Sequence, residues 1–109
     1  MRLLLLILCF PLYALGQNTI ALPEILNYSK QTYNAGTQNW GIHQDSRGLL
    51  YVANNEGMLR YDGAFWSIYP LPNRTNVRSV YVANDQQIFV GGQDELGFFK
   101  PDASGRLQY

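Results

Sequence analysis

The sequence has little from which a metal centre or a nucleophilic active site could be built. It contains one cysteine and one histidine in 109 residues. A zinc site needs several Cys, His or carboxylate ligands at close quarters, and a Cys-His or Ser-His-Asp arrangement needs partners that this stretch does not supply. We therefore expect no metal, no cofactor and no catalytic residue, and predict that the chain is not an enzyme. His43 is expected to be an ordinary strand residue.

The chain also has no excess of charge. Eight basic residues balance eight acidic ones, and charged residues make up only 15% of the sequence. Nucleic-acid binding requires a basic surface, so no nucleic-acid contact is expected within this fragment. What is present instead is a hydrophobic share of 47% and an aromatic share of 14%, which favours a folded, strand-rich protein.

The longest apolar run is too short to cross a membrane. It extends from Leu3 to Leu15, contains Pro11, follows Arg2, and ends near the small residues Ala14 and Gly16. A spanning helix needs about 20 apolar residues, whereas this pattern is typical of a secretory signal peptide. We predict a signal peptide at residues 1–16, cleaved after Gly16, and an exported mature chain. The alternative is an uncleaved membrane anchor.

The chain repeats itself. Tyr51-Val52-Ala53 matches Phe89-Val90-Gly91 at an offset of 38, whereas Gly57 matches Gly97 and Asp62 matches Asp102 at an offset of 40. The two-residue difference is expected to fall in the polar turn after the second strand of the repeat. Each copy is therefore a unit of roughly 40 residues.

Within the first copy the pattern predicts a four-stranded meander. Apolar stretches separated by Asx- and Gly-rich turns place the strands at Trp40–Gln44, Leu49–Ala53, Met58–Tyr61 and Phe65–Tyr69. The second stretch is continuously apolar and suits a strand covered on both faces, and the fourth is expected to turn Ser67 outward. Asp45 is interpreted as a turn former whose carboxylate accepts backbone N–H groups. No helical spacing is visible.

Four strands in a unit of about 40 residues are typical of a β-propeller blade. We predict an all-β fold made of the first two four-stranded blades of a propeller, preceded by a signal peptide. The expected division is an irregular segment at residues 17–39, blade 1 at 40–73 and a truncated blade 2 at 74–109. A lone β-sandwich is the alternative, although a sandwich does not require internal self-similarity.

The stretch "QNWGIHQDSRGLLYVANNEGMLRYDGAFWSIYPLPN", residues 38–73, resembles the first blade of the two-component regulator propeller family. Residues 77–109 resemble its second blade, although Phe98-Phe99-Lys100-Pro101 replaces the plain Tyr-Asp strand end. The resemblance implies a periplasmic sensor propeller in a membrane-spanning transcriptional regulator with a triple-tyrosine domain, a transmembrane helix, and a kinase or DNA-binding region. The membrane would be reached only through a downstream segment, and the rest of the same chain would be the partner.

Two other functions fit the same pattern. One is a propeller glycosidase or lyase whose catalytic residues lie outside this fragment, and the other is an extracellular binding or scaffold propeller. The eight aromatic residues at blade spacing are expected to pack between blades before they serve as sugar-stacking platforms. They are Trp40, Tyr61, Trp66, Tyr69, Tyr81, Phe89, Phe98 and Phe99.

In a propeller the entry to a blade and the turn between its second and third strands lie on one face of the ring. That face has the amides, cations and indole that a saccharide or other polar ligand, or a docking partner, would use. The predicted ligand or partner residues are Trp40, Asn54, Asn55, Glu56, Arg78, Gln93, Asp94 and Glu95.

Overall fold

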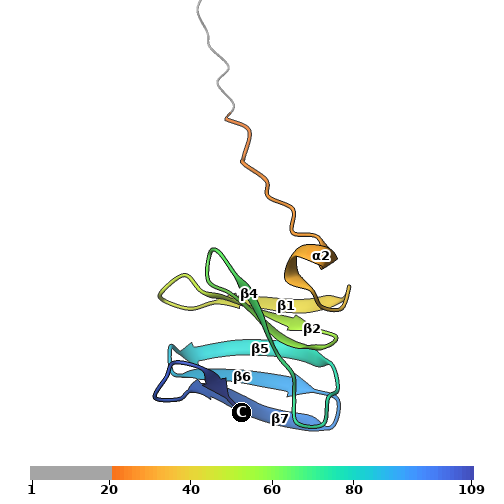
Figure 1. Cartoon of the computed structure of the whole chain (residues 1–109), viewed down its shortest axis with the longest axis vertical. Coiled ribbons are helices and arrows are strands. Elements are labelled where there is room, and N and C mark those ends of the chain that lie inside the picture. Colours follow the sequence, from red (N-terminus) through yellow and green to blue (C-terminus); the bar gives the residue numbers. More distant parts are fainter. Residues whose placement is uncertain (1–20) are drawn as a thin grey trace, which may run out of the picture.

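The computed structural model describes residues 21–109, which form an all-β unit of two four-stranded antiparallel sheets (Figure 1). The predicted signal peptide lies outside the described residues. Both sheets are meanders in which each strand pairs with the next one along the chain. The prediction of an all-β fold is confirmed.

The first sheet contains β1 (Asn39–Gln44), β2 (Leu50–Asn54), β3 (Gly57–Tyr61) and β4 (Trp66–Tyr69). Each of these bounds lies within one residue of the predicted strand. The continuously apolar strand β2 is buried from Tyr51 to Asn54, as expected for a strand covered on both sides. Asp62 accepts hydrogen bonds from the backbone N–H groups of Ala64 and Phe65, which closes the turn between β3 and β4.

The second sheet contains β5 (Val77–Asn84), β6 (Gln87–Gly92), β7 (Glu95–Pro101) and β8 (Leu107–Gln108). Its register corrects the predicted alignment of the two copies. Val52 pairs with Leu59 in the first sheet, and Val90 pairs with Gly97 in the second, so the offset of 38 continues through the third strand. The counterpart of Gly97 is therefore Leu59 and not Gly57. The polar turn between β6 and β7 is no longer than the turn between β2 and β3 of the first sheet. The two extra residues of the second copy therefore lengthen the end of β7.

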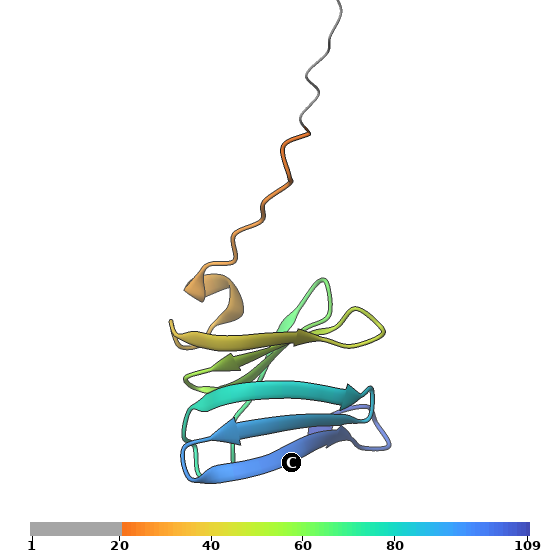
Figure 2. The same cartoon turned by 180° about the vertical axis from the view of Figure 1, so that it is seen from behind.

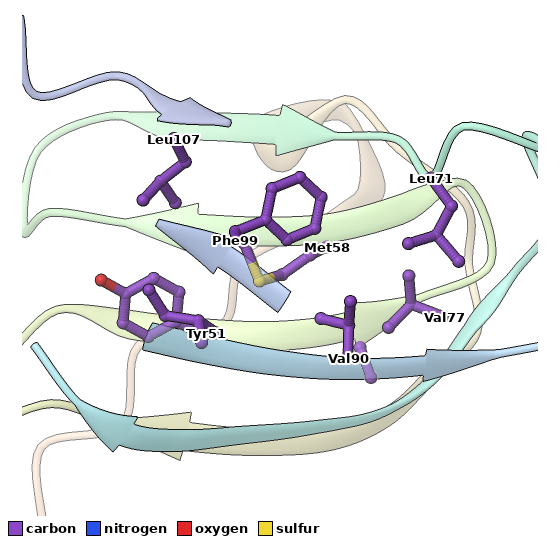
Figure 3. Close-up of a cluster of buried hydrophobic side chains, with 9 residues drawn as sticks. Tyr51, Met58, Leu71, Val77, Val90, Phe99 and Leu107 are labelled. Atoms are coloured by element: carbon purple, nitrogen blue, oxygen red, sulfur yellow. The ribbon is translucent and has the colours of Figure 1, made fainter. Parts of the chain in front are cut away.

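The two sheets stack face to face around a shared core (Figure 3). The front face of the first sheet is the side toward the second sheet, and it contributes Tyr51, Ala53 and Met58. The second sheet buries its back face against it. The core residues on the second sheet are Val77, Ile88, Val90, Phe99 and Leu107. Figures 1 and 2 show the first sheet above the second, with β5 as the strand of the second sheet nearest to the first, and β5 contacts both β1 and β2.

The offset of 38 relates the faces of the two sheets. Tyr51 on the front face of the first sheet corresponds to Phe89, and Phe89 pairs with Phe98 on the opposite side of the second sheet from the core. Phe89, Phe98, Tyr81 and Leu96 are all exposed there. Each sheet therefore has an equivalent front face, which is buried in the first sheet and open in the second.

The back face of the first sheet is partly covered by residues 28–36, here called the strap. Tyr33 and Ala35 of the strap pack against Val52 and Leu59. The strap includes the short helix α2 (Lys30–Tyr33), which ends at Asn34 in the left-handed conformation. The segment predicted to be irregular thus contains one helical turn, which the sequence pattern did not indicate because four residues show no amphipathic period.

The outward placement predicted for Ser67 is wrong. Ser67 pairs with Arg60 and is half-buried, whereas Ile68 is exposed on the back face beside Leu59. Alternation along β4 is present, but its apolar residue Ile68 points to the back face, which the strap covers only in part. The aromatic residues of the second sheet are divided between its two faces. Phe99 lies in the core, whereas Tyr81, Phe89 and Phe98 lie on the open front face.

Candidate functional site

One end of the molecule gathers the predicted ligand residues. Figure 1 shows the β2–β3 and β6–β7 turns at the same end, together with the start of β5. The β1–β2 and β5–β6 turns lie at the other end. The meander produces this arrangement because antiparallel strands place alternate turns at opposite ends of a sheet.

Trp40 and Arg78 join the two sheets at this end. The Arg78 guanidinium carbon lies 5.1 Å from the centre of the Trp40 ring. This is a cation–π contact between the first strand of one sheet and the first strand of the next. The indole Nε1 of Trp40 donates a hydrogen bond of 3.1 Å to Asn55 Oδ1, which fixes the orientation of the ring. Trp40 keeps 47% of its surface exposed, so the fixed ring is accessible.

Amide groups extend this cluster along the first sheet. Asn55 Nδ2 donates to Gln38 Oε1 at 2.9 Å, and the Asn55 backbone N–H donates to the Gln38 carbonyl at 3.1 Å. Asn55 and the exposed Glu56 also line a hollow of about 350 Å³ together with Arg74. The cluster of Trp40, Asn55 and Arg78 is named the end cluster below.

Arg78 retains capacity to bind a ligand. Its Nε donates to Asn76 Oδ1 at 3.3 Å, and no carboxylate among residues 21–109 forms an ion pair with it. A guanidinium has five N–H donors, so several of them face solvent above the indole. The end cluster can therefore hold a polar or anionic group by hydrogen bonds.

Asn54 has a different position from the other predicted residues. Its side chain is fully buried and binds the strap, since Nδ2 donates to the Gly36 carbonyl at 2.7 Å and Oδ1 accepts from the Gly36 N–H at 3.1 Å. Oδ1 also accepts the N–H of Glu56, and Nδ2 also donates to Asn39 Oδ1. Asn54 fastens the strap and has no surface left for a ligand.

Gln93, Asp94 and Glu95 form a second group at the same end. The Gln93 carbonyl accepts hydrogen bonds from Asn73 and Thr75, and Asp94 occupies the left-handed turn position with φ of 56°. Glu95 accepts a hydrogen bond of 2.7 Å from the Tyr109 hydroxyl. Burial and this bond to Glu95 together raise the pKa of Tyr109 to about 12. Among the described residues, no hydrogen bond or ion pair joins this group to the end cluster.

The opposite end contains a polar network that links the sheets. The buried Asp45 carboxylate accepts from the N–H groups of Arg47 and Leu49 and from the Tyr51 hydroxyl, which confirms its predicted role as a turn former. Arg47 Nη2 lies 2.7 Å from Asp45 Oδ2. Burial acts to raise the pKa of Asp45, but the hydrogen bonds from Arg47 and Leu49 outweigh it and lower that pKa.

Asp85 connects this network to the second sheet. It accepts hydrogen bonds from the backbone N–H and the hydroxyl of Ser46. Only the equivalent position of the two turns could have indicated this link from the sequence, because Ser46 and Asp85 lie 39 residues apart.

A groove lies between the strap and the back face of the first sheet. Its volume is about 460 Å³, and Tyr28, Trp40, Ile42 and Trp66 are among its lining residues. The Trp66 Nε1 atom is buried there and has no hydrogen-bond partner among the residues that the structure describes. This groove could not be predicted from the sequence, because one of its walls is the strap folded onto the sheet.

Two further observations concern residues 21–109. No three His, Cys, Asp or Glu side chains in this range come together in a way that could hold a metal ion. No helix in the same range has the length and apolar character to cross a membrane. The polar clusters that are present can bind by hydrogen bonding and stacking.

The fold and the end cluster define an all-β protein made of two stacked antiparallel meanders with one accessible aromatic and cationic end. Comparison with known proteins adds no relative: no protein-family model, no curated protein and no solved structure matches the chain.

Proposed function

We propose that this chain provides the first two blades of a β-propeller that serves as the exported, periplasmic sensor portion of a membrane-spanning transcriptional regulator. The observation that carries the proposal is the equivalence of the two sheets. The second sheet leaves open the same front face that the first sheet buries against it, as blades in a ring require. The resemblance of residues 38–109 to regulator propellers supplies the sensor role.

The end cluster is the proposed ligand or partner site. Trp40 offers an indole face held in position by Asn55, and Arg78 offers free N–H donors beside it. A saccharide or another polar ligand could stack on the ring and hydrogen-bond to the guanidinium. Because Trp40 and Arg78 belong to different sheets, a ligand held by both would alter the contact between the sheets, which is a route from binding to signal.

Signalling assays with the full-length regulator test this site. Trp40→Ala, Asn55→Ala and Arg78→Ala should each weaken the response of a reporter gene to the inducing ligand while export and protein level stay normal. Gln86→Ala is the matched control, since Gln86 is an exposed residue of the β5–β6 turn at the other end. Equal loss from Gln86→Ala, or no loss from the three cluster variants, contradicts the site.

The exported location has its own test. Intact-mass measurement of the protein recovered from the periplasm should give a mature N-terminus at Gln17. The full reading frame should encode further repeats, one apolar segment of about 20 residues and a cytoplasmic kinase or DNA-binding region. A reading frame that ends after the propeller would favour the binding or scaffold alternative.

A further inference from the structure

We propose that the hollow between Glu56 and Arg74 binds a small zwitterion, namely an α-amino acid with an aliphatic side chain. The ammonium group of the ligand would donate hydrogen bonds to the Glu56 carboxylate, and its carboxylate would accept them from the Arg74 guanidinium. The hollow has a volume of about 350 Å³. It is lined by Asn55, Glu56, Ile68, Pro70 and Arg74. This site is separate from the contact between Trp40 and Arg78, and it does not depend on the sensor role.

The two charged walls of the hollow come from different connections. Glu56 lies in the turn between β2 and β3, and Arg74 lies in the linker between β4 and β5. Their side chains form no hydrogen bond or ion pair within residues 21–109, where the ion pairs are those of Arg47 with Asp45 and Asp85. A carboxylate and a guanidinium that line one hollow without pairing can both be used by a ligand that carries both charges. Both residues lie beyond the ends of the strands, so neither belongs to a face on which sheets stack.

The backbone around the hollow is held in place. A Cβ added to Gly57 would lie 2.6 Å from the Tyr69 carbonyl oxygen and 2.9 Å from Pro70 Cα, so the β2–β3 turn packs directly against the start of the linker. Asn55 is bonded to Gln38 through its backbone N–H at 3.1 Å and its side-chain Nδ2 at 2.9 Å. A site whose walls are already fixed loses little freedom when a ligand binds.

The backbone of Arg74 is fixed in an unusual conformation. Its φ of 55° lies in the left-handed region, and its N–H donates to the Leu71 carbonyl at 2.9 Å. The side chains of its neighbours Asn73 and Thr75 each donate to the Gln93 carbonyl at 3.1 Å, which ties the linker to the second sheet. A residue other than glycine adopts this conformation at a cost, and such residues concentrate at ligand sites.

The lining of the hollow defines the class of ligand. A guanidinium binds a carboxylate through two parallel N–H donors, and the Glu56 carboxylate accepts from an ammonium group. Ile68 and Pro70 add apolar surface beside these charges, which suits an aliphatic side chain. The volume is at the lower end of the range of about 300 to 1,000 Å³ that is usual for small-molecule sites. An amino acid such as leucine has all three groups in a molecule of the right size.

Isothermal titration calorimetry of the full-length protein with L-leucine tests the site. Two analogues separate the charges, since L-leucinamide lacks the carboxylate and N-acetyl-L-leucine lacks the ammonium group. Each analogue should bind about tenfold more weakly than L-leucine or worse, because each leaves one charged wall without a partner. Absence of L-leucine binding up to about 10 mM, or equal binding of both analogues and L-leucine, overturns the proposal.

Variants show whether the binding occurs in this hollow. Glu56→Gln and Arg74→Asn should each weaken L-leucine binding about tenfold or more, and Asn tolerates the left-handed backbone of residue 74. Both side chains are exposed, so both variants should keep the melting temperature of the wild type. Lys100→Gln is the control, because it removes an exposed charge from β7, away from the hollow. Full affinity in Glu56→Gln or Arg74→Asn, or equal loss in Lys100→Gln, contradicts the site.

Two further comparisons assign the contacts. L-leucinamide should bind wild type and Arg74→Asn equally, since it has no carboxylate for Arg74 to recognise, and a further loss in Arg74→Asn would contradict that pairing. Arg78→Ala should keep the affinity for L-leucine to within about twofold, because Arg78 does not line the hollow. Normal L-leucine binding together with an unchanged signalling response in Arg78→Ala would reject the sensor site and retain this one.

Discussion

The imidazole Nδ1 of His43 accepts a hydrogen bond of 2.7 Å from the backbone N–H of Val82. His43 lies in β1 and Val82 lies in β5, so this bond crosses between the two sheets. Since β5 is an edge strand of its sheet, some of its N–H groups point away from β6, and His43 supplies a partner for one of them. The His43 ring also lies 5.2 Å from that of Tyr81. The one histidine of the chain therefore helps to hold the sheets together.

Replacing His43 by Leu should destabilise the protein by about 1 to 3 kcal/mol, because the Val82 N–H would be left without a partner in a partly buried position. His43→Asn should recover part of the loss, since its side-chain oxygen can take the place of Nδ1. Urea unfolding followed by tryptophan fluorescence measures both. Equal stability of the Leu and Asn variants would show that the hydrogen bond contributes nothing.

Asp45→Asn should cost about 1.5 to 3 kcal/mol near neutral pH, because the buried carboxylate accepts bonds from Arg47 and from two backbone N–H groups. The pKa of Asp45 is lowered in the folded protein, so its stabilisation is present above the unfolded value of about 4 and is lost as pH falls through the folded pKa. The difference between wild type and variant should therefore shrink in acid.

Unfolding free energies measured between neutral pH and about pH 3 check this window. Asp94→Asn is the control, since Asp94 is exposed and Asn also tolerates the left-handed turn, and it should change stability by less than about 0.5 kcal/mol. A constant difference between wild type and Asp45→Asn at all pH values would contradict the assignment of the stabilisation to the Asp45 charge.

Gly57→Ala should destabilise the protein by more than about 1 kcal/mol. Gly57 has φ of 147°, and an added Cβ would lie 2.6 Å from the Tyr69 carbonyl oxygen. Gly41→Ala is the matched control in the same sheet, because no atom of residues 21–109 outside its chain neighbours lies within 4 Å of a Cβ built there. Thermal melts of both variants give the comparison, and similar melting temperatures would show that the backbone at Gly57 adjusts without cost.

Asn54→Ala should release the strap. The buried Asn54 amide makes two hydrogen bonds to the backbone of Gly36, so its removal should cost about 2 to 3 kcal/mol and expose residues 28–36 to proteolysis. Limited proteolysis with mapping of the cleavage sites measures the effect. Gln31→Ala, in the exposed helical turn α2, should leave the cleavage pattern unchanged. Retained protection in Asn54→Ala would mean that the aromatic contacts of Tyr33 hold the strap alone.

Local sequence determined the strands and their turns. Alternating and continuous apolar stretches separated by Asp62-Gly63 and similar turns predicted each strand of the first sheet to within one residue. The role of Asp45 could be predicted for the same reason, because an aspartate in a tight turn bonds to backbone N–H groups two to four residues away. These features depend on neighbours in the chain, and the sequence displays such neighbours directly.

Contacts between distant residues were decided only by the tertiary structure. The sequence placed Asn54 with the ligand residues, but the folded strap buries its amide against Gly36. The pairing of His43 with Val82, and of Trp40 with Arg78, follows from which edges and faces meet when the two sheets stack. The register of the repeat was decided in the same way, because a two-residue shift keeps every side chain on the same face. Apolar patterning specifies the face of each residue, and only the packed sheets specify its partner.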